Sequence, residues 1–73
     1  MKKNTPANDW QKIVSKLKEI AIEQNISQNK MAELTGMKRP NITRLYSLRY
    51  APNLRTVVLI AGALNYKLDL VTI

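Results

Sequence analysis

The side chains of this chain with the strongest chemical character are its cations, and the arginines among them lie in the second half of the sequence. Residues 34–68 contain no Asp or Glu. The same segment holds Lys38, Lys67 and all the arginines of the chain, which are Arg39, Arg44, Arg49 and Arg55. The planar guanidinium of arginine forms paired hydrogen bonds with a phosphate or with the edge of a guanine, whereas lysine is sufficient for solubility. Segregation of the arginines therefore favours a binding surface over a merely solvated basic face.

The overall charge indicates what such a surface would bind. Twelve Lys and Arg against five Asp and Glu give a formal net charge of +7 and an isoelectric point near 10.1. A charge of this sign and size favours a polyanionic partner, either a nucleic acid or an acidic membrane surface. We rank the membrane surface last, because so small a domain needs the apolar faces of its helices for its own core.

The composition removes most enzyme chemistry. The chain has no Cys and no His, and their absence excludes disulfides, thiolate nucleophiles, Cys/His zinc sites and imidazole bases. Glu19 and Glu23 are the one close pair of acids, and they are better explained as solvated counter-charge to nearby lysines. We therefore expect a protein that is not an enzyme and that has no cofactor and no metal.

Length and hydropathy bound the fold and the location. A chain of 73 residues with a hydrophobic content of 45% is expected to form one compact domain. The longest apolar run, residues 57–64 if Gly62 is counted, is much shorter than the roughly 20 residues that a membrane-spanning helix needs. Residues 1–10 have no apolar stretch that would make a signal peptide, so we expect a cytoplasmic protein that does not bind a membrane.

Apolar spacing predicts two helices in the first half of the chain. Apolar residues recur at three- and four-residue steps within residues 8–24, which is typical of an amphipathic helix. Asn8 is its expected N-cap, with Gln11 as the partner in a capping box. A second, short helix is expected from residue 28 to 34 or 35. Ser27 is its expected N-cap, Ile26 and Met31 form a hydrophobic staple, and Gly36 ends it.

A third helix is expected over about residues 39–47. Pro40 fits only in the first turn, where its missing N–H has no partner, so the N-cap is Lys38 or Arg39. A hydrophobic staple favours Lys38, whereas the steric restriction on the residue before proline favours Arg39. The two alternatives stay open. The apolar residues expected on its inner face are Ile42, Leu45 and Tyr46.

The last part of the chain predicts a helix and then a strand. Asn53 precedes a helix over residues 54–64, in which Gly62 is simply tolerated at a cost of ~1 kcal/mol relative to Ala. Residues 67–73 are expected to form a strand. Because a lone strand leaves backbone groups unpaired, we expect it to pair with its copy in a second chain. The residues expected at that dimer contact are Leu68, Leu70, Val71 and Ile73.

Several short motifs occur in the order typical of one family. They are SQNKMAELTG at residues 27–36, then Ile42 and Leu45, then PNL at residues 52–54 and IAGAL at residues 60–64. Over residues 17–70 they resemble the XRE helix-turn-helix family, which includes lambda repressor and Cro. The resemblance implies an all-α, lambda-repressor-like bundle of four to five short helices. It implies a sequence-specific repressor that binds double-stranded DNA and contacts the major groove with the third helix.

The resemblance also assigns DNA contacts to individual residues. Gln28 stands where the family commonly has a glutamine that contacts a phosphate. Arg44 is the first candidate for paired hydrogen bonds with a guanine, and Thr43 and Pro40 are candidates for thymine methyl groups. The whole predicted DNA-binding set is Gln28, Lys38, Arg39, Pro40, Asn41, Thr43, Arg44, Ser47, Arg49 and Arg55.

The sequence departs from the family at three positions. Many members have a buried pair of arginine and glutamate where this chain has Ala21 and Tyr46. Since apolar packing often replaces a buried ion pair without loss of stability, we predict that Tyr46 packs near Ala21. Leu48 stands where the family often has glycine. Because leucine avoids positive φ, we expect the third helix to run longer or to end differently here.

The tail has a resemblance of its own. Residues 64–72 are similar to the C-terminal strand of the HipB-type antitoxins, which are dimeric repressors that also bind a toxin kinase. This similarity implies a homodimer with two recognition helices about 34 Å apart, one turn of DNA. It also implies an alternative function, that of an antitoxin whose main role is to bind and neutralise a toxin protein. The expected organisation is a flexible N-terminus at 1–7, a helix-turn-helix domain at 8–66 and a dimerisation strand at 67–73.

Overall fold

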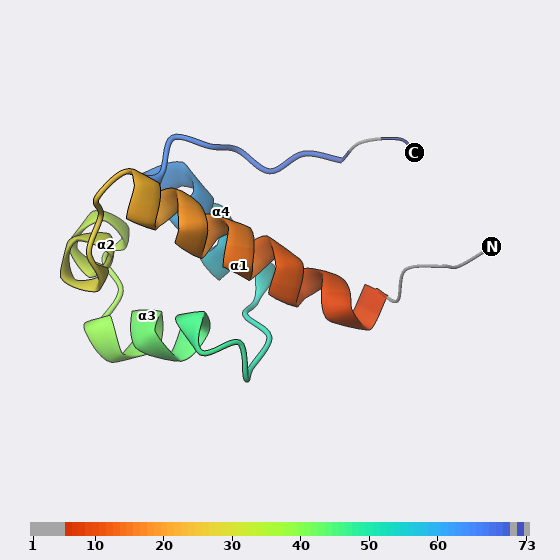
Figure 1. Cartoon of the computed structure of the whole chain (residues 1–73), viewed down its shortest axis with the longest axis horizontal. Helices are drawn as coiled ribbons and strands as arrows, with labels where there is room; N and C mark the ends of the chain where they lie inside the picture. The colour runs from red at the N-terminus through yellow and green to blue at the C-terminus, as the bar shows by residue number, and fades with distance from the viewer. Residues whose placement is uncertain (1–5, 71, 73) are drawn as a thin grey trace.

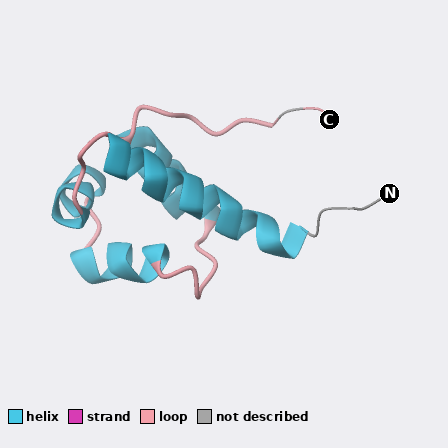
Figure 2. Ribbon diagram, in the orientation of Figure 1, coloured by secondary structure: helices cyan, strands magenta, loops and turns pink. Residues whose placement is uncertain are grey.

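The computed structural model describes residues 6–70 and 72, and the side chains from Asp9 onward. Within these residues the chain is all-α and forms no strand (Figures 1 and 2). The four helices are α1 (Pro6–Glu23), α2 (Gln28–Thr35), α3 (Arg39–Tyr46) and α4 (Leu54–Ala63). This confirms the all-α bundle that the sequence predicts. The part of the predicted flexible N-terminus that precedes Pro6 lies outside the described residues.

Helix α1 begins earlier than the sequence predicts. It starts at Pro6, which is well suited to the first turn of a helix because its fixed φ is helical. Asn8 therefore lies inside the helix, and the prediction that it is the N-cap is wrong. Gln11 is not the partner in a capping box either: its side-chain amide donates a hydrogen bond to the Leu48 carbonyl, 3.1 Å away. The contact ties α1 to the turn that follows α3.

Local signals define α2 and the turn after it as predicted. The side chain of Ser27 caps α2 by accepting a hydrogen bond of 3.1 Å from the backbone N–H of Lys30. Asn25, between α1 and α2, has a φ of 59°. Gly36 ends α2 with a φ of 75°, and its N–H donates to the carbonyl of Ala32. A left-handed residue at this point turns the chain sharply into α3.

The open question of the α3 N-cap is resolved in favour of Lys38. Lys38 has an extended backbone, with φ −79° and ψ 144°, and α3 starts at Arg39. Arg39 is thus helical although it precedes Pro40, whose ring fits in the first turn. The carbonyl of Lys38 accepts hydrogen bonds from the N–H groups of Asn41 and Ile42.

The end of α3 contradicts one part of the prediction for Leu48. Leu48 has a φ of 62°, so it adopts the conformation that we expected a leucine to avoid. Its side chain packs against the core and its carbonyl accepts the hydrogen bond from Gln11. These tertiary contacts offset a backbone cost of about 1–2 kcal/mol for a non-glycine residue in this region. The helix therefore ends where the family often places a glycine.

Helix α4 begins and ends close to the predicted positions. Asn53 is its N-cap, and the side-chain oxygen accepts a 2.8 Å hydrogen bond from the N–H of Thr56. Asn65, with a φ of 66°, follows the last turn. A methyl group added at Gly62 would meet nothing within 4 Å. The glycine is thus tolerated, as predicted, and does not serve a close approach of two backbones.

One apolar core joins all four helices. It consists of side chains that are less than a tenth exposed, namely Val14, Leu17, Ala21, Met31, Ile42, Leu45, Tyr46, Ile60, Ala61 and Leu64. Helix α2 packs on α3 and α4, and α1 also packs on both. Figure 1 shows α3 at one side of the molecule, with the C-terminal tail on the opposite side. The core therefore fixes α3 from behind and leaves its outer face uncovered.

Tyr46 is buried, as its predicted packing near Ala21 requires. It is 9% exposed and belongs to the same core cluster as Ala21, which is 1% exposed. The ammonium of Lys18 lies 5.9 Å from the centroid of the ring. The hydroxyl oxygen of Tyr46 is buried and finds no hydrogen-bond partner among the described residues. Burial raises the pKa of the Tyr46 phenol above its ordinary value.

Residues 66–70 run back along the molecule (Figure 1), and they pair with no strand among the described residues of their own chain. Tyr66 and Leu68 lie at an apolar groove of about 410 Å³, together with Ile13, Leu17 and Ile20 of α1. Leu70 is 96% exposed. Of the residues predicted to hold a dimer together, Val71 and Ile73 lie outside the described residues. The predicted pairing with a second chain stays a prediction.

The two glycines give a first test of this fold. Gly62→Ala is expected to raise the free energy of unfolding by up to about 1 kcal/mol, because alanine is the better helix former and the site has room. Gly36→Ala is the matched control, and it is expected to lower that free energy by about 1–2 kcal/mol because of its positive φ. Urea unfolding followed by circular dichroism measures both. Destabilisation by Gly62→Ala would show that the backbone there is constrained.

The unpartnered hydroxyl gives a second test. Tyr46→Phe is expected to raise the free energy of unfolding by about 1 kcal/mol at neutral pH, because a buried polar group without a partner is removed. In the wild type the raised pKa of Tyr46 favours the neutral phenol in the folded state. This raised pKa contributes fully to the free energy of unfolding below the ordinary pKa of 10.0, and the contribution is lost as the pH rises through the folded pKa. The stability advantage of Tyr46→Phe over the wild type therefore widens above about pH 10.

Urea titrations at neutral and alkaline pH measure this difference. Tyr66→Phe is the control, because Tyr66 is 53% exposed, and it is expected to leave stability unchanged at neutral pH. A loss of stability in Tyr46→Phe would mean that the hydroxyl has a partner.

Candidate nucleic-acid interface

The outer face of α3 presents polar and cationic side chains. Ile42 and Leu45 are buried against the other helices. Pro40, Thr43 and Arg44 are exposed, and residues three or four apart lie on the same side of a helix. The sequence predicted this division between an inner and an outer face of α3. A rigid helix with such a face has the dimensions that the major groove of B-DNA admits.

The start of α2 and the middle of α3 are joined by a side-chain hydrogen bond. The hydroxyl of Thr43 donates to the side-chain oxygen of Gln28, with a separation of 2.5 Å. Gln28 is the first residue of α2 and is half-buried. Sequence reasoning assigned both residues to the site but did not predict the bond between them. The bond joins the predicted phosphate contact of α2 to a predicted base contact of α3.

The side chain of Arg44 contacts an aromatic ring. Its guanidinium carbon lies 4.4 Å from the centroid of the Tyr50 ring, which is a favourable distance for stacking and for a cation–π interaction. Tyr50 lies in the loop between α3 and α4. Tyr50 is not among the predicted site residues, because the path of that loop depends on how Leu48 ends the helix.

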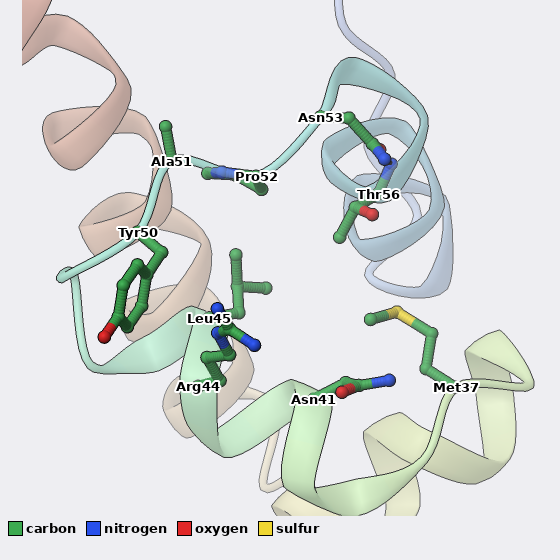
Figure 3. A pocket seen from close by; sticks show the side chains of 9 residues that line it. All are labelled: Met37, Asn41, Arg44, Leu45, Tyr50, Ala51, Pro52, Asn53 and Thr56. Carbon is green, nitrogen blue, oxygen red and sulfur yellow. The ribbon is translucent and has the colours of Figure 1, made fainter.

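Arg44 and Tyr50 line a hollow between α3, the loop and the start of α4. The hollow has a volume of about 320 Å³. Figure 3 shows Asn41 and Arg44 on α3, Tyr50 on the loop and Asn53 at the start of α4 around it. Asn41, a predicted phosphate contact, therefore lies beside Arg44 at the edge of the outer face.

The other predicted contacts surround this centre. Lys38 and Arg39 are exposed at the start of α3, and Arg55 is exposed in the first turn of α4. The hydroxyl of Ser47 donates to the Arg44 carbonyl at 2.6 Å and accepts from the N–H of Arg49 at 3.3 Å. Ser47 thus organises the turn itself. Within the described residues the guanidinium groups of Arg49 and Arg55 make no hydrogen bond, and the structure does not join them to the centre.

Among the described residues, no cation of this face forms an ion pair with an acid. Among the described residues the one ion pair is that of Lys30 and Glu33, 3.0 Å apart on α2. All the acids of the chain except Asp69 precede residue 34. Within the described part of the chain, ion pairs therefore leave the positive charge of α3 and of the following loop available to a polyanion.

Comparison with known proteins agrees with this geometry. A protein-family model described as helix-turn-helix matches residues 17–71, which include the whole of α2 and α3. The chain therefore belongs to the XRE type of the helix-turn-helix family, a family of DNA-binding regulators. No curated protein and no solved structure matched the chain. No helix among the described residues has the length and apolar content needed to cross a membrane.

Proposed function

We propose that the protein is a sequence-specific DNA-binding repressor that inserts α3 into the major groove. The observation that carries the proposal is the arrangement of α3, whose inner face is fully packed while its outer face presents Thr43 and Arg44. Arginine distinguishes guanine from the other bases through two hydrogen bonds in the major groove. A protein bound in this way across a promoter blocks access to it.

The remaining predicted residues divide into two roles. Pro40 and Thr43 are placed to contact thymine methyl groups beside the guanine that Arg44 binds. Gln28, Asn41 and Ser47 are proposed phosphate contacts, which fix the register of the helix on the duplex. The cations proposed to contact phosphates along the edges of the groove are Lys38, Arg39, Arg49 and Arg55.

Selection of tight-binding duplexes from a random pool, followed by fluorescence anisotropy titration, tests the proposal. The wild type is expected to prefer the selected duplex over a scrambled one, with an affinity that falls steeply as salt rises. Arg44→Ala is expected to lose roughly 10- to 100-fold in affinity for the selected duplex and most of the preference. Lys12→Ala is the control with the same change of charge on α1, and it is expected to retain the preference. Equal binding of the wild type to all duplexes would contradict a sequence-specific role.

The tail supports a proposal about the oligomeric state. Leu70 is 96% exposed, and Leu68, two residues before it, lines the apolar groove together with Tyr66 and α1. Apolar surface of this kind is favourable for pairing with the tail of a second copy. The tail and α3 lie on opposite sides of the molecule (Figure 1), so that such a pairing would leave both recognition helices uncovered.

Analytical ultracentrifugation of the full chain tests the dimer. The wild type is expected to sediment as a dimer at micromolar concentration and Leu70→Asp as a monomer. Ile22→Asp is the matched control, because Ile22 is 66% exposed on α1, and it is expected to remain dimeric. A wild type that sediments as a monomer up to about 100 times that concentration, in the presence and absence of DNA, would refute the dimer.

The similarity of the tail to that of the HipB-type antitoxins carries the alternative function. In this alternative function, the exposed side chains of Leu68 and Leu70 bind a toxin protein, and DNA binding is secondary. Co-purification with the product of the adjacent gene distinguishes the two functions. A stable complex that is lost in Leu70→Asp would support the antitoxin role, and the absence of such a complex would favour the repressor alone.

A further inference from the structure

We propose that Tyr50 is a positioning residue that holds Arg44 in the orientation in which it contacts a base, and that Tyr50 thereby sets the specificity of the protein at that base pair. The inference rests on the proposed function, because it assumes that Arg44 contacts DNA. It adds a residue outside the recognition helix to the specificity-determining set.

The guanidinium of Arg44 lies over the ring of Tyr50 at the distance of a cation–π contact. The guanidinium carbon of Arg44 lies 4.4 Å from the centre of the Tyr50 ring. Arg44 lies in the last turn of α3 and Tyr50 in the loop beyond it, and both side chains line the same hollow (Figure 3). Stacking on a ring face leaves the N–H groups at the edge of the guanidinium free to donate.

Restraining this particular side chain has a direct effect on affinity. A free arginine side chain loses about 2 kcal/mol of rotamer entropy when it is fixed. A side chain that is already held before binding loses less of that entropy when it meets its partner. The effect is largest for a partner that requires two hydrogen bonds in one plane, such as a guanine edge.

The loop that carries Tyr50 is itself restrained. The carbonyl of Leu48 accepts the hydrogen bond from Gln11 of α1, and Ser47 bonds to both sides of the turn. Pro52 fixes its own φ and restricts the residue before it. Tyr50 therefore lies in a segment whose backbone is restrained on both sides of it. Such a restraint is necessary if the ring is to orient another side chain.

Stability of the fold does not account for the position of Tyr50. Its side chain is 56% exposed and does not belong to the core, which already contains a tyrosine at position 46. Within the described residues, its hydroxyl makes no hydrogen bond. Removal of the ring is thus expected to leave the fold intact and to change the behaviour of Arg44.

A set of four variants tests the inference: Tyr50→Ala, Tyr50→Phe, Arg44→Ala and the double variant Arg44→Ala/Tyr50→Ala. Each is titrated against the selected duplex and against a duplex in which the base pair that Arg44 contacts is replaced. That base pair is the one at which Arg44→Ala loses discrimination. Circular dichroism of each variant confirms that the fold is retained.

We expect Tyr50→Ala to lose about three- to tenfold in affinity for the selected duplex, with a smaller loss on the replaced one. Tyr50→Phe retains the ring and is expected to bind within about twofold of the wild type. The double variant is expected to bind no worse than Arg44→Ala, because the ring acts only through the arginine. The salt dependence of Tyr50→Ala is expected to match the wild type, because no charge is removed.

Three results would overturn the inference. Unchanged or tighter binding by Tyr50→Ala would show that the ring does not position Arg44 for DNA. An equal loss on both duplexes would show a contact that does not depend on the base. Independent losses that multiply in the double variant would show that Tyr50 acts without Arg44. Failure of the proposed function itself appears separately, as a wild type that does not prefer the selected duplex, and that result would overturn both.

Discussion

The packing of α3 on α2 is the constraint on which the rest of the structure depends. Ile42 of α3 and Met31 of α2 are both fully buried in the same core, and Gly36 makes the sharp turn that brings the two helices together. In a domain of this size the apolar core is small, so each such contact contributes a large fraction of the total stability. Because the inner face of α3 is fixed, the direction of its outer side chains is fixed too.

Polar contacts refine what the apolar core determines. The bond between Thr43 and Gln28 fixes one edge of the outer face, and the stack of Arg44 on Tyr50 fixes the other. The bond from Gln11 to the Leu48 carbonyl connects the turn after α3 to α1. A helix whose base-contacting side chains are oriented before binding loses less conformational entropy when it meets DNA. The contacts that hold the bundle together thus also orient the side chains that are proposed to contact bases.

The sequence predicted the parts of this structure that are determined locally. Ser27 and Gly36 act through hydrogen bonds and backbone angles within a few residues, and each occupies the predicted role. Asn53 precedes α4 as predicted, and the structure adds that it caps this helix. Leu48 was predicted wrongly because tertiary packing outweighs its local preference against positive φ. Tyr50 was not included in the site for a related reason: its place beside Arg44 follows from the path of the loop, which no local pattern specifies.

The insertion of α3 into the major groove is the central claim, and methylation interference on a selected duplex tests it most directly. Methylation of guanine N7 modifies the major groove, whereas methylation of adenine N3 modifies the minor groove. Partially methylated duplex is separated into bound and free fractions, and the modified positions in each fraction are then mapped. The account predicts that methylation of one or more specific guanines prevents binding by the wild type and that this effect is lost in Arg44→Ala. Interference by adenine N3 methylation alone would place the protein in the minor groove and contradict the account.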